Sequence, residues 1–321
     1  SLNYNTEKFP LGKLKKKTIT DGYNALKELS LVLTDSQPSE PSNKKEIERL
    51  SNLFYTVVPH DFGRQRPPLI NSPQALKEKL QLVESLAEIE IAQSLMKVGS
   101  LPRDADGNLM NRLDAHFASL KLNKLESFDH AHNEFVLIRD YVKNTHGQTH
   151  SGYDLEVVDA FRLERHSEPE RFKEAGSDKL SNRALLWHGS RLGVYFADCV
   201  SKSANYCFTN QTDNEALMLL CEVALGETYE LTNSDFYAAE NSKKAGKTAT
   251  LGVGRSQPDP KGKKYLNDGT LVPCGQVINP ETPQARNTCL QYNEYIVYDI
   301  KQIKFRYLIK LRFNYKQTYF G

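Results

Sequence analysis

The residues that could carry chemistry gather in the C-terminal half of the chain, around its only tryptophan. Trp187 is followed directly by His188, Gly189 and Ser190, and two leucines precede it. This apolar lead-in predicts a buried strand, so His188 should stand at the end of that strand. Taken alone, a tryptophan followed by a histidine is more often a core aromatic beside a hydrogen-bonded histidine than a functional site.

Two later stretches strengthen the case for a site. Residues 195–206 and 292–297 place further polar and aromatic side chains on or beside predicted strands. Glu294 stands among tyrosines and β-branched residues, where a buried carboxylate is costly unless it has a partner or a function. The candidate side chains of these stretches are Tyr195, Lys202, Ser203, Tyr206 and Glu294.

The elements that must position these residues change character near residue 150. Before it, apolar residues recur at helical spacing and predict helices over 19–33, 47–57, 73–98 and 130–143. The third of these begins with a Ser-Pro pair, a favourable helix start. No convincing strand appears before about residue 150, so residues 1–130 should form an all-helical domain.

Beyond residue 150 the pattern is typical of strands. Strands are predicted over 155–164, 216–225 and 303–315, and Asp268-Gly269 between apolar residues predicts a hairpin. Few helical stripes separate these strands, which argues against a doubly wound parallel sheet. The expected fold class is a multi-domain one, with an all-helical domain followed by a mostly antiparallel α+β domain over 131–321.

Bulk composition fits this organisation. A chain of 321 residues suggests two domains, and 42 basic against 40 acidic residues give no strong pull toward nucleic acid. No apolar run reaches the roughly 20 residues of a membrane helix. The five cysteines form no C-x-x-C pair, which predicts reduced thiols. The chain begins at Ser1 without a signal pattern, so it is expected to be an excised fragment.

Several short motifs lack the residues that would make them functional. Residues 61–63 read Asp-Phe-Gly, as in kinases, but no H-R-D catalytic loop or glycine-rich loop accompanies them. Residues 246–248 lack the earlier glycine of a phosphate loop, and residues 104–108 lack the turn glycine of a calcium loop. His146 and His150 have metal-like spacing without supporting ligands, so surface histidines around a turn are the simpler interpretation. No metal is expected.

Taken together, these stretches resemble the signature of poly(ADP-ribose) polymerases, especially the DNA-damage-dependent nuclear type. The segments that carry the signature are 185–191, 193–207 and 290–299. In the first half, residues 10–14 and 54–68 resemble the regulatory helical domain of this family, and residues 141–146 and 153–157 resemble the start of its transferase domain. The resemblance implies a regulatory helical domain over 1–130 and an ADP-ribosyltransferase catalytic domain over 131–321.

The resemblance also implies a reaction. The enzymes of this family cleave the bond between nicotinamide and ribose in NAD, and transfer ADP-ribose to proteins and to the growing polymer. The transition state resembles an oxocarbenium ion, which requires a nearby negative charge and a held leaving group. Glu294 is implied as the catalytic carboxylate, on the nicotinamide-ribose 2′-hydroxyl and the acceptor hydroxyl. Lys202 is implied as its assistant, with an ordinary surface lysine as the alternative.

The NAD contacts follow from the same resemblance. His188 is implied to bond the adenosine-ribose 2′-hydroxyl, and the backbone of Gly189 to meet the carboxamide, since glycine leaves room for a ligand. Ser203 is implied to bond the carboxamide, and Tyr206 and Tyr195 to stack on the two sides of the nicotinamide ring. Core packing is the alternative for the tyrosines. The implied NAD-binding residues are His188, Gly189, Ser190, Tyr195, Ser203 and Tyr206.

Regulation and partners are implied as well. In this family the helical domain restrains access of NAD until DNA damage is sensed. Glu84 and Glu88 match acidic positions that face the site, although an ordinary polar stripe is the favoured interpretation. The implied partners are NAD, protein acceptors, poly(ADP-ribose) and nicotinamide-mimicking inhibitors. The resemblance implies that DNA would act only through modules outside this fragment. It also implies a nuclear protein of DNA repair that makes no membrane contact.

The chain departs from the family pattern between His188 and Tyr195. Only six residues stand there, in place of a longer segment that covers the donor site. Six residues at about 3.3–3.6 Å each can hardly rebuild this connection, so residues missing between Leu192 and Gly193 are favoured over a natural short form. Two functions stay open: an active polymerase fragment, or an impaired, donor-loop-deleted fragment that binds NAD or nicotinamide analogues as a scaffold.

Overall fold

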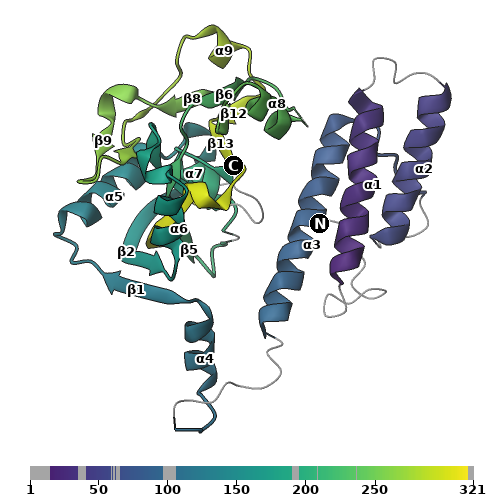
Figure 1. Cartoon of the computed structure of the whole chain (residues 1–321). Coiled ribbons are helices and arrows are strands. Elements are labelled where there is room, and N and C mark those ends of the chain that lie inside the picture. Colours follow the sequence, from purple (N-terminus) through teal and green to yellow (C-terminus); the bar gives the residue numbers. More distant parts are fainter. Residues whose placement is uncertain are drawn as a thin grey trace. The chain divides into compact units, whose positions relative to one another are not determined.

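The computed structural model describes residues 15–34, 41–58, 60, 62, 66–96, 106–189, 195–207, 209–235 and 237–316 (Figure 1). The chain divides into two compact units, Ser1–Pro102 and Arg103–Gly321. We call the first the helical unit and the second the β unit, and each is described by itself.

Three helices form the described part of the helical unit. They are α1 (Lys16–Thr34), α2 (Pro41–Val57) and α3 (Pro73–Met96). Their apolar stripes meet in one core that includes Leu26, Leu50 and Phe54, each at most 1% exposed. The chain between α2 and α3 is tied to this core because the Ile70 N–H donates to the buried Ser51 hydroxyl at 3.0 Å. The three helices predicted in this part of the sequence are therefore confirmed.

A seven-stranded sheet forms the centre of the β unit. Its strand order is β1-β2-β14-β5-β3-β10-β9, and every neighbouring pair is antiparallel except β3 with β10. The strands are β1 (Leu122–Ser127), β2 (Tyr153–Arg165), β3 (Arg183–His188), β5 (Glu215–Ala224), β9 (Lys264–Tyr265), β10 (Leu271–Val272) and β14 (Ile303–Tyr315). The long strand β14 lies between β2 and β5, with its apolar residues buried at alternate positions.

Two smaller sheets complete the β unit. One has the order β4-β13-β7-β6 and the other the order β11-β8-β12. Their strands are β4 (Tyr195–Phe196), β6 (Thr228–Leu231), β7 (Ala249–Gly252), β8 (Gly254–Pro258), β11 (Val277–Ile278), β12 (Leu290–Tyr292) and β13 (Glu294–Val297). A bridge between Trp187 and Ala197, with backbone bonds of 2.8 and 3.0 Å, links the end of β3 to the segment after β4.

The helices of the β unit are short. They are α4 (Arg112–Ser119), α5 (Asn133–Asn144), α6 (Glu168–Glu174), α7 (Val200–Ala204), α8 (Ala238–Lys244) and α9 (Pro283–Arg286), with 3₁₀ turns η2 (Gln148–His150), η3 (Ser177–Lys179), η4 (Pro260–Gly262) and η5 (Ile300–Gln302). The helix predicted near 130–143 is confirmed as α5, whose His132 side chain accepts a hydrogen bond from the Glu134 N–H.

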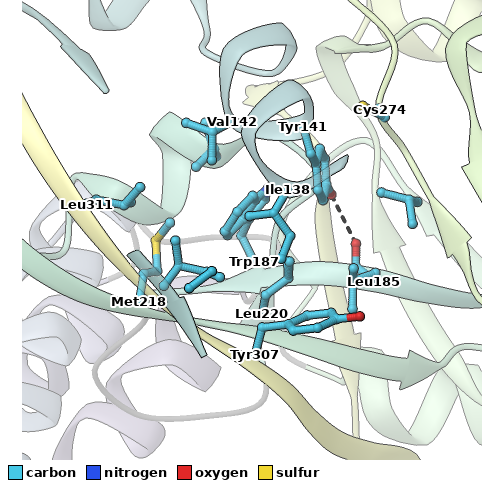
Figure 2. Packing of buried hydrophobic residues seen from close by; sticks show 14 of the residues in the cluster. Ile138, Tyr141, Val142, Leu185, Trp187, Met218, Leu220, Cys274, Tyr307 and Leu311 are labelled. Atoms are coloured by element: carbon cyan, nitrogen blue, oxygen red, sulfur yellow. Dashed lines mark hydrogen bonds between the residues drawn. The ribbon is translucent and has the colours of Figure 1, made fainter. Parts of the chain in front are cut away.

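Trp187 lies at the centre of the main core, between α5 and the seven-stranded sheet (Figure 2). Its ring is fully buried and contacts the ring of Tyr141, with ring centres 4.9 Å apart. The Tyr141 hydroxyl donates to the carbonyl oxygen of Leu185 at 3.0 Å, so the polar atom of the Tyr141 side chain has a hydrogen-bond partner (Figure 2). Because α5 is thus bonded to β3, the end of β3 at His188 has a fixed position.

The predicted fold class is confirmed: helices come first, and a mostly antiparallel sheet follows. The predicted long strands and the hairpin at Asp268-Gly269 are also present. The expectation of no strand before about residue 150 was wrong, because β1 pairs with β2 along the edge of the main sheet. Helix α4 was not predicted. Among the described residues, no helix is long and apolar enough to cross a membrane, and no cluster of three potential metal ligands occurs.

Candidate active site

Glu294 and Lys202 form a close ion pair in the β unit. The ammonium Nζ of Lys202 lies 2.7 Å from Oε1 of Glu294 and also donates to the backbone oxygen of Tyr292 at 3.1 Å. The two charged side chains are 17% and 30% exposed, respectively. Both charges therefore remain within reach of solvent and of a ligand, while each offsets the desolvation of the other.

The short elements that carry this pair are held from several sides. Glu294 is the first residue of β13, which pairs with β4 on one edge and β7 on the other. Lys202 lies on α7, whose first N–H, at Val200, donates to the hydroxyl of the buried Thr145. A five-residue helix has little stability of its own, so these tertiary contacts determine where Lys202 stands.

His188 ends β3 and is half-buried. Its Nδ1 lies 2.9 Å from the backbone oxygen of Tyr195. A carbonyl oxygen can only accept, so Nδ1 carries the proton and Nε2 is left as an acceptor. Burial lowers the pKa of His188, against a smaller rise from the bond to Tyr195. A neutral imidazole whose second nitrogen is an acceptor suits a hydroxyl donor such as a ribose 2′-hydroxyl.

Gly189 and Ser203 approach each other closely. A Cβ atom on Gly189 would lie 2.1 Å from the backbone oxygen of Ser203, so no other residue fits without moving α7. The Ser203 hydroxyl is buried and donates to the carbonyl oxygen of Trp187 at 3.2 Å. To donate to a carboxamide oxygen, this hydroxyl would have to leave Trp187. The sequence predicted an open approach to a ligand at Gly189, and the structure adds this backbone contact.

Tyr195 and Tyr206 are large aromatic residues with much of their surface in solvent. They are 42% and 43% exposed, so core packing does not account for them. An aromatic ring with exposed surface can stack on a planar ligand. Ser190, the remaining residue of the predicted NAD-binding set, lies outside the described residues, as do Leu192 and Gly193. The same holds for the side chains of Glu84 and Glu88 on α3.

A buried polar cluster lies beside Glu294, and the sequence reasoning assigned it no role. Asp198 is 2% exposed, and its Oδ2 accepts from Asn293 Nδ2 at 2.8 Å and from the Tyr295 hydroxyl at 2.9 Å. Burial raises the pKa of Asp198, and the two hydrogen bonds oppose that rise. The only available signal was that all three residues stood in the stretches singled out around Tyr195 and Glu294.

His150 also lies near the ion pair. Its Nδ1 is 2.8 Å from the hydroxyl oxygen of Ser201, and its ring centre lies 5.2 Å from that of Tyr292. Ser201 is fully buried and also accepts from the Gly147 N–H at 2.7 Å. The interpretation of His146 and His150 as surface histidines was therefore wrong: both are half-buried, although they do surround a turn, η2.

The arrangement brings together three pairs of residues predicted from the sequence: Lys202 with Glu294, His188 with Tyr195, and Gly189 with Ser203. Together they offer a carboxylate held by a cation, a neutral imidazole acceptor and a buried hydroxyl. Two partly exposed aromatic rings complete the set. These groups suit a ligand with ribose hydroxyls, an amide and an aromatic ring.

Comparison with known protein families assigns both halves of the chain. The family model described as the poly(ADP-ribose) polymerase catalytic domain matches residues 132–193 and 192–313, in two pieces that meet after His188. The model described as the poly(ADP-ribose) polymerase regulatory domain matches residues 1–117. The two pieces of the catalytic-domain match together contain Lys202, Glu294 and every predicted NAD-binding residue.

Individual relatives agree with the family assignment. The chain is 40% identical over 348 residues to poly [ADP-ribose] polymerase 2 of Zea mays, covering 98% of this chain and 50% of that protein. It is 41% identical over 344 residues to poly [ADP-ribose] polymerase 2 of Arabidopsis thaliana, covering 98% and 51%. Poly [ADP-ribose] polymerase 1 of Gallus gallus is 40% identical over 339 residues, covering 97% and 32%. The chain thus spans at most about half the length of these relatives, and it belongs to the poly(ADP-ribose) polymerase family.

Proposed function

We propose that this chain is the catalytic fragment of an NAD-dependent poly(ADP-ribose) polymerase. It cleaves NAD and transfers ADP-ribose to protein acceptors and to the growing polymer. The observation that carries the proposal is the ion pair between Lys202 and Glu294, 2.7 Å apart, in a unit that matches the catalytic domain of the family. The relatives bear the name of this activity.

Glu294 would supply the negative charge that the reaction needs. As the bond to nicotinamide breaks, positive charge develops on the ribose, and a fixed carboxylate favours that state over the ground state. One carboxylate oxygen is held by Lys202, and the other can accept a hydrogen bond from the ribose 2′-hydroxyl or from the acceptor hydroxyl. Lys202 would keep the carboxylate in the productive orientation.

The remaining residues would bind the two ends of NAD. The backbone of Gly189 and the hydroxyl of Ser203 would take the carboxamide of the leaving nicotinamide, and Tyr206 and Tyr195 would stack on its ring. At the other end, His188 Nε2 would accept from the adenosine-ribose 2′-hydroxyl. Binding the leaving group and the ribose in fixed positions lowers the entropy cost of reaching the transition state.

Nicotinamide release from NAD by the purified chain tests this proposal. Glu294→Gln should lower the rate of release by about 10²-fold or more while the protein stays folded, because it removes the charge and keeps the shape. Glu281→Gln, at an exposed glutamate in an ion pair with Arg286, is the matched control and should leave the rate unchanged. Absence of nicotinamide release by the unaltered chain, or an unchanged rate in Glu294→Gln, would contradict the proposal.

The junction after His188 bears on how active the chain is. Because the alignment with the maize relative runs over 348 residues, more than the 321 of this chain, the relatives have residues without a counterpart here. The family model matches the chain in two pieces that overlap at 192–193, which supports a segment missing between Leu192 and Gly193. Insertion of the corresponding maize segment should lower the KM for NAD. If the KM were unchanged, the donor site would not depend on that segment.

The helical unit would regulate this activity. A division of function near residue 130 is supported by the end of the regulatory match at 117 and the start of the catalytic match at 132. Nuclear location, a role in DNA repair, control by DNA through modules outside residues 1–321, and binding of nicotinamide-mimicking inhibitors belong to the same proposal. Removal of residues 1–102, which takes away the helical unit and keeps β1 paired with β2, tests the regulatory role and should raise the rate of NAD cleavage.

A further inference from the structure

Asp198 is a buried carboxylate to which the proposed reaction assigns no task. It is 2% exposed, and it lies between β4 and α7, two residues before the start of α7. Burial of a carboxylate is unfavourable unless hydrogen bonds or charges compensate for the lost water. Two donors compensate on Oδ2, Asn293 Nδ2 at 2.8 Å and the Tyr295 hydroxyl at 2.9 Å, and the nearby charge of Lys202 adds to their effect.

These two donors stand on either side of Glu294 in the sequence. Asn293 is the single residue between β12, which pairs with β8, and β13, which pairs with β4 and β7. The chain therefore passes from one sheet to another at Asn293, and strand pairing alone does not fix this step. Asn293 is bonded at both ends of its amide, since its Oδ1 also accepts from the Gly254 N–H at 2.8 Å.

Asp198 also stands just before the helix that carries Lys202, α7. Asp198 and Lys202 are four residues apart, and Lys202 Nζ bonds both Glu294 and the backbone oxygen of Tyr292. The segment 198–202 thus contacts the residue before Asn293, Asn293 itself, Glu294 and Tyr295. Any shift of β13 along its axis would break several of these contacts at once.

We propose that Asp198 is a positioning residue that fixes Glu294 relative to Lys202 by accepting hydrogen bonds from both sequence neighbours of Glu294. This inference rests on the proposed function for its kinetic consequence, but not for its structural one. Asp198 acts through Asn293 and Tyr295 and contacts no substrate. A displacement of a reacting group by about 1 Å can lower a rate roughly 10²-fold, so the loss of both hydrogen bonds should be visible in kcat.

Two substitutions separate geometry from charge. Asp198→Asn keeps a carbonyl oxygen that can accept from Asn293 and Tyr295, but it removes the negative charge. Asp198→Ala removes the acceptor itself. Glu168→Ala is the matched control, because Glu168 is 4% exposed and accepts from the Phe305 N–H at 2.9 Å and from Arg171 at 3.3 Å, outside the candidate site.

Two measurements on the intact chain test the inference: nicotinamide release per folded molecule, and amide hydrogen exchange in residues 293–297. Asp198→Ala should lower kcat by about tenfold or more with a KM for NAD within about threefold of the original, and should speed exchange in 293–297 by about tenfold. Asp198→Asn should stay within about threefold in each quantity. Glu168→Ala should lower the unfolding temperature without either change.

The inference would be overturned by unchanged exchange in Asp198→Ala. A defect in Asp198→Asn as large as that in Asp198→Ala would also overturn it, because the charge rather than the hydrogen bonds would then be responsible. If the unaltered chain releases no nicotinamide, the proposed function fails. The exchange measurement still decides whether Asp198 holds residues 293–297.

Discussion

Lys202 and Glu294 stand 92 positions apart in the sequence, yet their charged groups meet at 2.7 Å. They come from a five-residue helix and a four-residue strand, neither of which would be stable alone. Their meeting therefore depends on the larger β unit, through Thr145 on one side and the strands β4 and β7 on the other. The ion pair couples the position of the proposed catalytic carboxylate to the position of α7.

Lys202→Met should weaken catalysis more than it weakens the fold. The change removes the donor to Glu294 and to the Tyr292 carbonyl, so the carboxylate loses its fixed orientation. We expect kcat for ADP-ribose transfer to fall by about tenfold or more in Lys202→Met. Lys202→Arg, which keeps a positive charge, should retain part of the original kcat. The check is to measure both the transfer of ADP-ribose to protein and the release of nicotinamide in each variant. Lys264→Met, at a half-exposed lysine paired with Asp140, is the control, and equal activity in the two methionine variants would refute the role of Lys202.

Gly189→Ala should destabilise the β unit and disturb the carboxamide site. The new Cβ would lie 2.1 Å from the Ser203 carbonyl oxygen, so α7 must move. The expected loss in free energy of unfolding is about 1–3 kcal/mol, read from denaturant unfolding followed by the fluorescence of Trp187. Gly152→Ala is the control, since no atom lies within 4 Å of its Cβ position. Equal stability of the two variants would show that the contact at Gly189 relaxes freely.

Tyr206→Ala should reduce the affinity for a nicotinamide analogue such as benzamide. Loss of one stacking face is worth about 0.5–1.5 kcal/mol, which corresponds to a Kd increase of roughly two- to tenfold. Calorimetric titration of the purified chain measures this change. Tyr265→Ala removes another exposed tyrosine, on β9, and should leave the Kd unaltered. An unchanged Kd in Tyr206→Ala would place the aromatic ligand elsewhere.

The helical unit should lose stability in mild acid because of His60. Burial lowers the pKa of His60 to about 4, and its ring stacks on Phe62 with ring centres 5.5 Å apart. The unfolded chain takes up the proton near the ordinary pKa of about 6.5, before the folded chain does. Stability is therefore full above pH of about 6.5 and falls as the pH drops toward about 4.

Two optical signals separate this effect from titration in the β unit. Trp187 is the only tryptophan and belongs to the β unit, so its fluorescence follows that unit alone, whereas far-ultraviolet circular dichroism also follows α1 to α3. His60→Gln should remove the acid-dependent loss from the dichroism transition and leave the fluorescence transition as before. If the acid-dependent loss of stability persisted in His60→Gln, titratable groups other than His60 would be responsible for it.

Long elements with regular periodicity could be predicted from the sequence, and edge elements could not. The stripes of α1, α2 and α3 and the alternation of β14 are patterns of one-sided burial, which sequence spacing records directly. Strand β1 was missed because it lies at the edge of its sheet, with mostly exposed residues and two leucines in a polar stretch. Helix α4 has eight residues and leaves Leu113 and Phe117 exposed, so its stripe indicates no core.

The candidate site was predictable as a set of residues but not as a geometry. Glu294 and His188 stood out by type and context. The role inferred for Asp198 depends on donors 95 and 97 positions away, and no local pattern reports such contacts. The turn with His146 and His150 was misjudged for the same reason, since the partner of His150 is Ser201 on α7.

The central place of β14 has a consequence for how the protein is made. This strand is the last described element of the chain, yet it lies between β2 and β5 in the seven-stranded sheet. During synthesis, the helical unit can form once residues 16–96 leave the ribosome, because all of its described core residues lie within them. The sheet cannot close until residues 303–315 have emerged. A nascent chain would therefore carry a folded helical unit before it carries any site able to bind NAD.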